Sequence, residues 1–235
     1  MMREVNLKVG LTPKHPCSYL AGQKEQLLVL LDKKLLCLEG YEQLLSAGFR
    51  RSGSDIYRPH CQLCSACESL RIDVARFVPS RSQKRIIRLN RDIEVIPSEQ
   101  DKPEYFDLYA RYINQRHQDG TMYPANRDQY QGFLQCDWLP PLFIEFRLGQ
   151  QLVAVAVTDR LKESLSALYT FYDPELEHRS LGSFAILSQV IMAREHHKKW
   201  VYLGYQVDDC QKMNYKQHFR PHQRLVAGHW QAMKD

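Results

Sequence analysis

The chain has 235 residues and a formal net charge of +5, with 44% hydrophobic and 25% charged residues. These values are typical of a globular protein that can bury a core without disulfides, and they exclude collagen-like and disordered chains. There is no run of 18 apolar residues, and the first ten residues contain an acid and no apolar segment. We therefore expect no transmembrane helix, no signal peptide, no membrane partner and a cytoplasmic location.

The first part of the chain is predicted to form short elements. A helix is expected over 41–47 and should end at Gly48, with a short strand or turn after it. Alternating apolar and polar residues predict a strand over 70–74. Ser80 is the predicted N-cap of the next helix.

The helix predicted after Ser80 is strongly basic. Between residues 76 and 91, six cations occur without an acid: Arg76, Arg81, Lys84, Arg85, Arg88 and Arg91. Arg81, Lys84, Arg85 and Arg88 follow the spacing of one helix face. Surface faces usually intersperse acids, so this stripe predicts contact with a phosphate backbone. A solvated face is the alternative.

The seven cysteines are an odd number and indicate reduced thiols rather than a disulfide framework. Cys61, Cys64 and Cys67 recur at every third residue, a spacing that can bring soft thiolates onto a zinc ion or an iron–sulfur cluster. Cys17 is the candidate fourth ligand. Buried or redox-sensitive free thiols are the alternative, and a catalytic cysteine is less favoured because no partner can be placed beside it.

The second part begins after a polar segment, 97–103, that is bracketed by prolines. It predicts a boundary between regions 1–98 and 99–235. The expected elements then follow in order: a helix over 104–117, strands over 142–148, 152–158 and 164–172, a helix over 180–197, a strand over 200–206, a short helix over 212–219 and a strand over 224–230. This order predicts an α+β fold in which helices flank a mixed sheet.

Arg179, Ser180 and Gly182 open the long helix. A glycine here allows a ligand to approach the helix N-terminus, where amide groups and the dipole favour phosphate. The alternative is that Ser180 simply caps the helix.

Several stretches resemble known transferases. The strand pair and Arg179-x-x-Gly182 resemble the pyrophosphate loop of the GNAT acyltransferase fold, but Phe184 departs from its last position. A closer resemblance is to the aminoacyl-tRNA–protein transferase family, and within it to the short bacterial aspartate/glutamate leucyltransferases. The matching stretches are Cys17-Ser-Tyr-Leu, Leu45-Ser-Ala-Gly-Phe-Arg-Arg-Ser-Gly, Tyr57-Arg-Pro-His-Cys-x-x-Cys-x-x-Cys, Phe77-x-Pro-Ser-Arg-Ser-Gln-x-Arg, Tyr169-Thr-Phe-Tyr-Asp-Pro, Arg179-Ser-Leu-Gly, Tyr202-Leu-Gly-Tyr and Lys212-Met-x-Tyr-Lys.

This resemblance implies a GNAT-like core on which the cysteine-bearing N-terminal region packs. It implies that leucine moves from leucyl-tRNA to the N-terminal Asp or Glu of a protein, which creates a destabilising N-terminus for proteolysis in an N-degron pathway. Leucine rather than arginine is suggested by the compact bacterial form. An iron–sulfur cluster is associated with the cysteine region of eukaryotic members, so the resemblance carries over only the possibility of such a cluster.

The chemistry of this reaction needs little from the protein. Aminoacyl-tRNA is an activated ester, and an α-amine with a pKa of about 7.7–8.0 is partly neutral. The protein must hold the two reactants together and stabilise the oxyanion, so no cofactor is required.

Tyr205 and Tyr202 are the predicted positioning or proton-relay groups, with core packing as the alternative for Tyr202. Lys212 and Lys216 are four residues apart and are expected to point the same way, with Tyr215 between them. Together with Arg76 or Arg58 they are candidates for binding phosphate or a substrate carboxylate. A solvated helix face is the alternative.

Two other functions are consistent with parts of the sequence. One is a GNAT N-acetyltransferase that uses acetyl-CoA, which Phe184 and the basic stretch disfavour. The other is a non-enzymatic nucleic-acid-binding protein with a cysteine-rich knuckle, which the Arg179 loop and the three-strand meander disfavour.

Overall fold

The computed structural model describes residues 7–233. Its N-terminal part is a four-stranded antiparallel sheet in the order β1 (Val9–Leu11), β4 (Leu27–Leu30), β6 (Asp55–Pro59), β5 (Arg50–Ser52). The hairpin of β2 (His15–Pro16) and β3 (Lys24–Glu25), the 3-10 helix η1 (Lys33–Leu35) and helix α1 (Leu38–Ser46) complete this region.

The main body is an eight-stranded sheet in the order β14-β13-β7-β12-β11-β10-β9-β8. Within the described residues, β11 and β12 alone pair in parallel, because the chain crosses back through a helix between them. The strands are β7 (Glu68–Asp73), β8 (Ile93–Ser98), β9 (Leu142–Leu148), β10 (Gln151–Arg160), β11 (Ser164–Tyr172), β12 (Trp200–Gln206), β13 (His222–Val226) and β14 (His229–Ala232).

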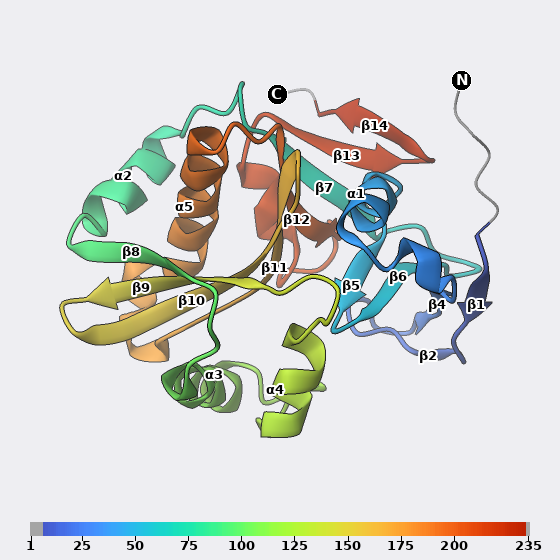
Figure 1. Ribbon diagram of the computed structural model, residues 1–235, viewed down its shortest axis with the longest axis horizontal. Coiled ribbons are helices and arrows are strands. Elements are labelled where there is room, and N and C mark those ends of the chain that lie inside the picture. The colour runs from blue at the N-terminus through green and yellow to red at the C-terminus, as the bar shows by residue number, and fades with distance from the viewer. Residues whose placement is uncertain (1–6, 234–235) are drawn as a thin grey trace.

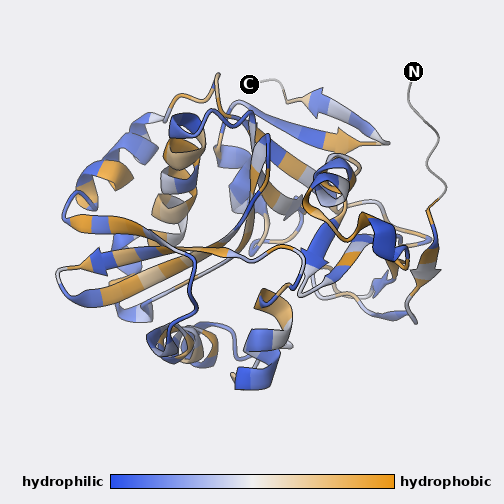
Figure 2. Ribbon diagram, in the orientation of Figure 1, coloured by the Kyte–Doolittle hydropathy of each residue, from blue (hydrophilic) through white to orange (hydrophobic). Residues whose placement is uncertain are grey.

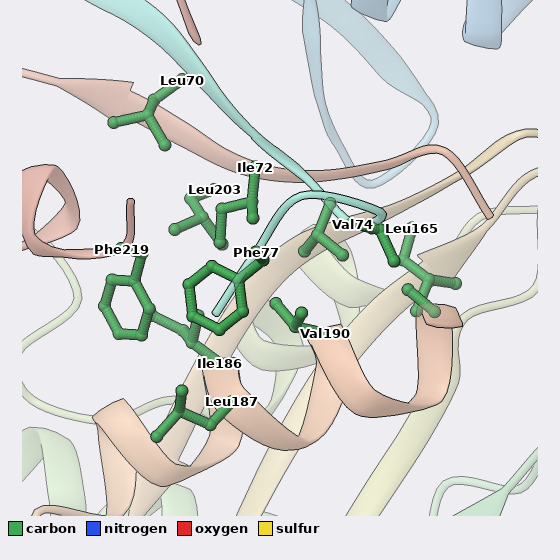
Figure 3. Close-up of a cluster of buried hydrophobic side chains, with 12 residues drawn as sticks. Leu70, Ile72, Val74, Phe77, Leu165, Ile186, Leu187, Val190, Leu203 and Phe219 are labelled. Carbon is green, nitrogen blue, oxygen red and sulfur yellow. The ribbon is translucent and has the colours of Figure 1, made fainter. Parts of the chain in front are cut away.

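Helices cover both faces of this sheet (Figure 1). On one face, α2 (Arg81–Leu89) packs on α5 (Leu181–Glu195), and the core beneath them includes Phe77, Val190 and Leu203 (Figure 3). On the other face, α3 (Pro103–Arg116) and α4 (Arg127–Leu134) pack with β10 and β11 around aromatic side chains. The turn η2 (Pro174–Arg179) leads into α5, and η3 (Asn214–His218) follows β12.

The N-terminal region is packed on the main sheet. Tyr41, Phe49 and Ile56 share one buried cluster with Leu161 and Tyr202 of the main body. A buried ion pair adds to this contact, because the Arg51 guanidinium lies 2.5 Å from a carboxylate oxygen of Asp159. The predicted α+β fold, with its N-terminal region packed on the sheet, is therefore confirmed.

Most predicted elements are present in the structure. The helix after Ser80 begins as expected, since the Ser80 hydroxyl accepts from the Gln83 amide and the Gln83 side chain accepts from the Ser80 amide. α2 contains both hydrophilic and hydrophobic residues, the hydrophobic ones in its second half (Figure 2). The single strand predicted over 224–230 is wrong, because Ala227 and Gly228 turn the chain with positive φ and divide it into β13 and β14.

The sheet takes strands from both sides of residue 98. β7 lies between β12 and β13, and β8 forms an edge beside β9. The division into regions 1–98 and 99–235 stays a prediction. Within the described residues, no helix combines the length and apolar character that crossing a membrane requires. Residues 1–6, on which the expectation of no signal peptide partly depends, lie outside the described residues.

Candidate active site

The parallel strands β11 and β12 part from each other. They pair only over Ser164–Ser166 and Trp200–Tyr202, yet they continue to Tyr172 and Gln206. The two strands therefore diverge toward their carboxyl ends. Ligand sites commonly form at this place in sheets with parallel strands.

Tyr202 and Tyr205 lie on the same face of β12 because of a β-bulge. Tyr202 is opposite Arg71 and Tyr205 is opposite Ser69, so three steps on β12 match two steps on β7. Gly204 supplies the bulge with a φ of 81°.

Only Tyr205 of these two borders an open space. Its ring lines a cavity of about 660 Å³, and its hydroxyl donates to the Gly48 carbonyl at 2.9 Å. Burial raises the pKa of the Tyr205 hydroxyl above its ordinary value. Tyr202 is 3% exposed in the core, and its hydroxyl accepts from Arg71 at 3.3 Å. The structure thus places Tyr202 as a core residue, and the catalytic role of Tyr205 stays a prediction.

Arg50 of β5 was not singled out from the sequence, yet it lies at the centre of this region. Its guanidinium carbon is 5.2 Å from the ring centroid of Tyr202 and 5.9 Å from that of Tyr205. Its Nη2 donates to the Gly204 carbonyl at 3.2 Å, whereas its Nε and Nη1 are buried without a hydrogen-bond partner. The link spans 154 residues of sequence, so local spacing could not have revealed it.

The two predicted lysines do not point the same way. Lys216 is 5% exposed, and its Nζ donates to the Tyr205 carbonyl at 2.5 Å. Burial, reinforced by the nearby charge of Arg50, lowers the pKa of Lys216 to about 7. Lys212 is exposed and forms an ion pair with Asp119 at 2.6 Å. The prediction fails because the segment is a turn followed by a short 3-10 helix, in which residues four apart do not share a face.

Tyrosines gather near the end of β11. Tyr112 of α3 and Tyr172 of β11 have ring centroids 4.8 Å apart, and the His117 ring lies 4.8 Å from that of Tyr112. Tyr215 is close enough that its charge would raise the pKa of Tyr112, although burial is the main cause of that shift. Tyr215 itself is 41% exposed. Exposed tyrosine faces of this kind suit stacking with a nucleobase.

The four predicted cysteine ligands line the same cavity as Tyr205. Cys17 comes from the turn after β2, and Cys61, Cys64 and Cys67 come from the segment between β6 and β7. Burial raises the pKa of the Cys67 thiol to about 12, and the other three cysteines add to the rise. Among residues 7–233, no three His, Cys, Asp or Glu side chains are arranged as a metal site. Metal binding therefore stays a prediction.

The residues predicted at the start of the long helix serve the fold. Arg179 forms a two-pronged ion pair with Asp92 at 2.9 and 3.0 Å. Ser180 has a φ of 53°, and its side chain caps no helix amide. A Cβ at Gly182 would lie 3.4 Å from the Tyr172 ring, so this glycine packs closely on β11.

The remaining predicted cations lie apart from one another. Arg58 stacks on the Phe49 ring at 5.0 Å and donates to the Ala47 carbonyl at 3.3 Å. Arg76 is exposed beyond the end of β7. Within residues 7–233, neither side chain forms a hydrogen bond or an ion pair with Lys216, so the expected grouping of these side chains is not seen.

The basic face of α2 is exposed as predicted. In the described part of the chain, none of its four cations forms an ion pair with a carboxylate: Arg81, Lys84, Arg85 and Arg88. The helix is joined to η3, since Gln83 Nε2 donates to the His218 carbonyl at 3.0 Å. The candidate phosphate-binding face is thus fixed to the segment that carries Lys216.

A mixed sheet with two diverging parallel strands defines the chain as a GNAT-like acyltransferase fold. The crystal structure of FemX has this fold in common with it, with a TM-score of 0.51 and 10% identity over 91% of this chain and 84% of FemX.

Sequence comparison then identifies the family. The profile "Arginine-tRNA-protein transferase, N terminus" matches residues 15–85, and "Arginine-tRNA-protein transferase, C terminus" matches residues 104–226. The aspartate/glutamate leucyltransferase of Aeromonas hydrophila is 63% identical over 98% of this chain and 97% of its own length. That of Pseudoalteromonas atlantica is 52% identical over 97% of this chain and 98% of its own length. The chain belongs to the arginine-tRNA–protein transferase family and is an aminoacyltransferase, which confirms the resemblance seen in the sequence.

Proposed function

We propose that this protein transfers the leucyl group of leucyl-tRNA to the N-terminal amine of proteins that begin with Asp or Glu. The observation that carries this proposal is the near full-length similarity, at 63% identity, to an aspartate/glutamate leucyltransferase. The product has an N-terminal leucine that destabilises the protein and marks it for proteolysis. A cytoplasmic location, where charged tRNA is made, belongs to the same proposal.

The basic face of α2 supports a tRNA donor. Its four exposed cations have no acidic partner among the described residues, so they remain available for phosphates. Because α2 is bonded to η3 through Gln83 and His218, a tRNA held on this face would lie against the segment that flanks Tyr205.

The diverging ends of β11 and β12 are the proposed place of reaction. The neutral α-amine attacks the ester carbonyl, the C–N bond forms, the ester C–O bond breaks, and the 3′-hydroxyl leaves with a proton. Holding both reactants in this opening supplies most of the catalysis, because the ester is already activated. Tyr205 is the proposed positioning group at its edge, and Tyr215 offers an exposed ring for the tRNA end.

An acetyl-CoA donor is disfavoured by the entrance to α5. Arg179, which would bind the pyrophosphate, is engaged with Asp92. Phe184 stands where that loop usually has a small residue, and its ring packs on Phe146 with centroids 5.6 Å apart. Because of these contacts, the start of α5 is not free to bind a pyrophosphate.

The cysteine cavity is proposed as a structural site for zinc or an iron–sulfur cluster. Four thiols are the soft donors that either group prefers, and Cys17, Cys61, Cys64 and Cys67 would hold it. A bound metal would rigidify the N-terminal region. The transfer reaction needs no Lewis acid, so substrate preference is expected to be independent of it.

The test uses the full-length protein, labelled leucyl-tRNA and peptides that differ only in the first residue: Asp, Glu, Ala or Lys. We expect leucine on the Asp and Glu peptides and little on the others, measured by mass spectrometry. Equal transfer to the Ala peptide would overturn the acceptor part of the proposal, and no transfer to any peptide would overturn the whole of it.

A further inference from the structure

Two buried cations flank Tyr205 without a carboxylate partner. Arg50 is 6% exposed and Lys216 is 5% exposed. Lys216 bonds to the Tyr205 carbonyl and lies 3.3 Å from the Met213 sulfur, while Arg50 has one hydrogen bond to the Gly204 carbonyl. In residues 7–233, neither side chain lies within ion-pair distance of an acid.

In the neighbouring Arg51, every side-chain nitrogen has a hydrogen-bond partner. Its Nε and Nη2 donate to Asp159 at 2.8 and 2.5 Å, and its Nη1 donates to the Gly53 and Leu134 carbonyls at 3.1 and 3.2 Å. Arg50, by contrast, has two buried nitrogen atoms without a partner. Buried charges are normally paired, because desolvation is costly.

The two cations also repel each other. The charge of Arg50 is one of the causes that lower the pKa of Lys216. An anion placed beside them would replace the missing partner of Arg50 and relieve this repulsion, so the arrangement favours binding of a carboxylate.

The cavity lies beside this pair of cations. Tyr205, which contacts both cations, forms part of its wall. Ser52 and Tyr57 also line the cavity; Ser52 follows Arg50 along β5, and Tyr57 is opposite Arg50 on β6. Arg50 itself does not line the cavity, but Ser52, Tyr57 and Tyr205 beside it do.

We propose that Arg50, assisted by Lys216, binds the side-chain carboxylate of the acceptor protein's N-terminal Asp or Glu. The inference rests on the proposed function and names the residues that read its acceptor. A site built around a buried cation discriminates strongly against the uncharged amide of the same shape, because the cation then stays unpaired.

The test compares leucyl transfer to peptides that begin with Asp or with Asn, which have nearly the same shape. We expect wild-type protein to prefer Asp by about 100-fold or more in kcat/KM. Arg50→Gln and Lys216→Met should each reduce this preference to below about tenfold, mainly by raising KM for Asp. Arg160→Gln, which changes an exposed arginine paired with Glu99, is the matched control and should keep the preference.

The outcomes separate the two proposals. If wild-type protein does not modify the Asp peptide, the proposed function fails. If wild-type protein does modify it, but a folded and active Arg50→Gln variant keeps the wild-type preference, only the role of Arg50 is overturned. Arg50→Lys replaces Arg50→Gln if the latter does not fold, and it should retain the Asp preference in part.

Discussion

The basic face of α2 allows a quantitative prediction for tRNA binding. We consider the double substitution Arg85→Glu and Arg88→Glu, which reverses two exposed charges that have no acidic partner in the described residues. Both side chains point away from the core that Ile86 and Ile87 of the same helix join. The change should therefore weaken binding without unfolding the protein.

The expected magnitude follows from counterion release. Each phosphate contact contributes about 0.9 to the slope of log affinity against log salt. Four contacts, from Arg81, Lys84, Arg85 and Arg88, give a slope of about −3.6 and a loss of roughly 150-fold in affinity between about 50 and 200 mM salt. With two contacts removed, the slope becomes about −1.8 and the loss about 12-fold.

Filter binding of labelled tRNA across this salt range measures the slope directly. A matched control is Lys33→Glu with Lys34→Glu, which reverses two charges in η1 of the N-terminal region. The control should keep the wild-type slope. A folded Arg85/Arg88 variant with an unchanged slope would refute the reasoning and leave the stripe as a solvated face.

Three other predictions concern stability and metal content. Asp159→Asn should lower the free energy of unfolding in urea by about 3–5 kcal/mol, because it leaves Arg51 buried without its counter-charge. Glu99→Gln, in an exposed ion pair, should lower it by under about 1 kcal/mol. Equal effects of the two substitutions would contradict this prediction. Lys216 has a lowered pKa of about 7, so the unfolded state binds more protons above that pH and stability rises with pH. Relative to Lys216→Met, wild-type protein should gain about 2 kcal/mol between about pH 7 and 9. A constant difference would show that the pKa of Lys216 is not lowered in the folded protein. Cys64→Ser should lower zinc or iron content and stability together without changing substrate preference. Metal content is measured by elemental analysis of protein purified without oxygen. Wild-type protein that is free of metal, fully stable and fully active would show that the four cysteines are ordinary thiols.

Local signals explain which elements could be predicted. The helix after Ser80 has its cap and its amphipathic spacing within one short stretch of chain, and the hairpin at Gly149 joins two strongly apolar strands. The edge strand β8 was missed because Pro97 and the polar residues after it indicate a loop. An edge strand tolerates that proline, since one side of it needs no ladder partner.

The helix α4 was also missed, although a signal for it exists. Asn126 caps this helix by accepting a hydrogen bond from the Gln129 amide at 3.1 Å. An Asn followed by polar helix formers and the apolar Phe133 and Leu134 fits a short amphipathic helix. The N-terminal strands are only two to five residues long, too short for a periodic pattern.

Only part of the candidate site could be predicted from the sequence. The four cysteines predicted as metal ligands line one cavity, and their binding of a metal stays a prediction. Arg50 depends on a bulge in a strand far along the chain, and the opposed directions of Lys212 and Lys216 depend on the 3-10 geometry of η3. Such features arise from tertiary packing and leave no periodicity in the sequence.

The central claim concerns the donor, and one measurement tests it most directly. The full-length protein is given a peptide that begins with Asp and, in separate reactions, leucyl-tRNA, arginyl-tRNA or acetyl-CoA at equal concentration. The account predicts that leucyl-tRNA alone gives substantial product, with a new amide bond at the peptide N-terminus. Efficient transfer from acetyl-CoA, or equal transfer of arginine and leucine, would contradict it.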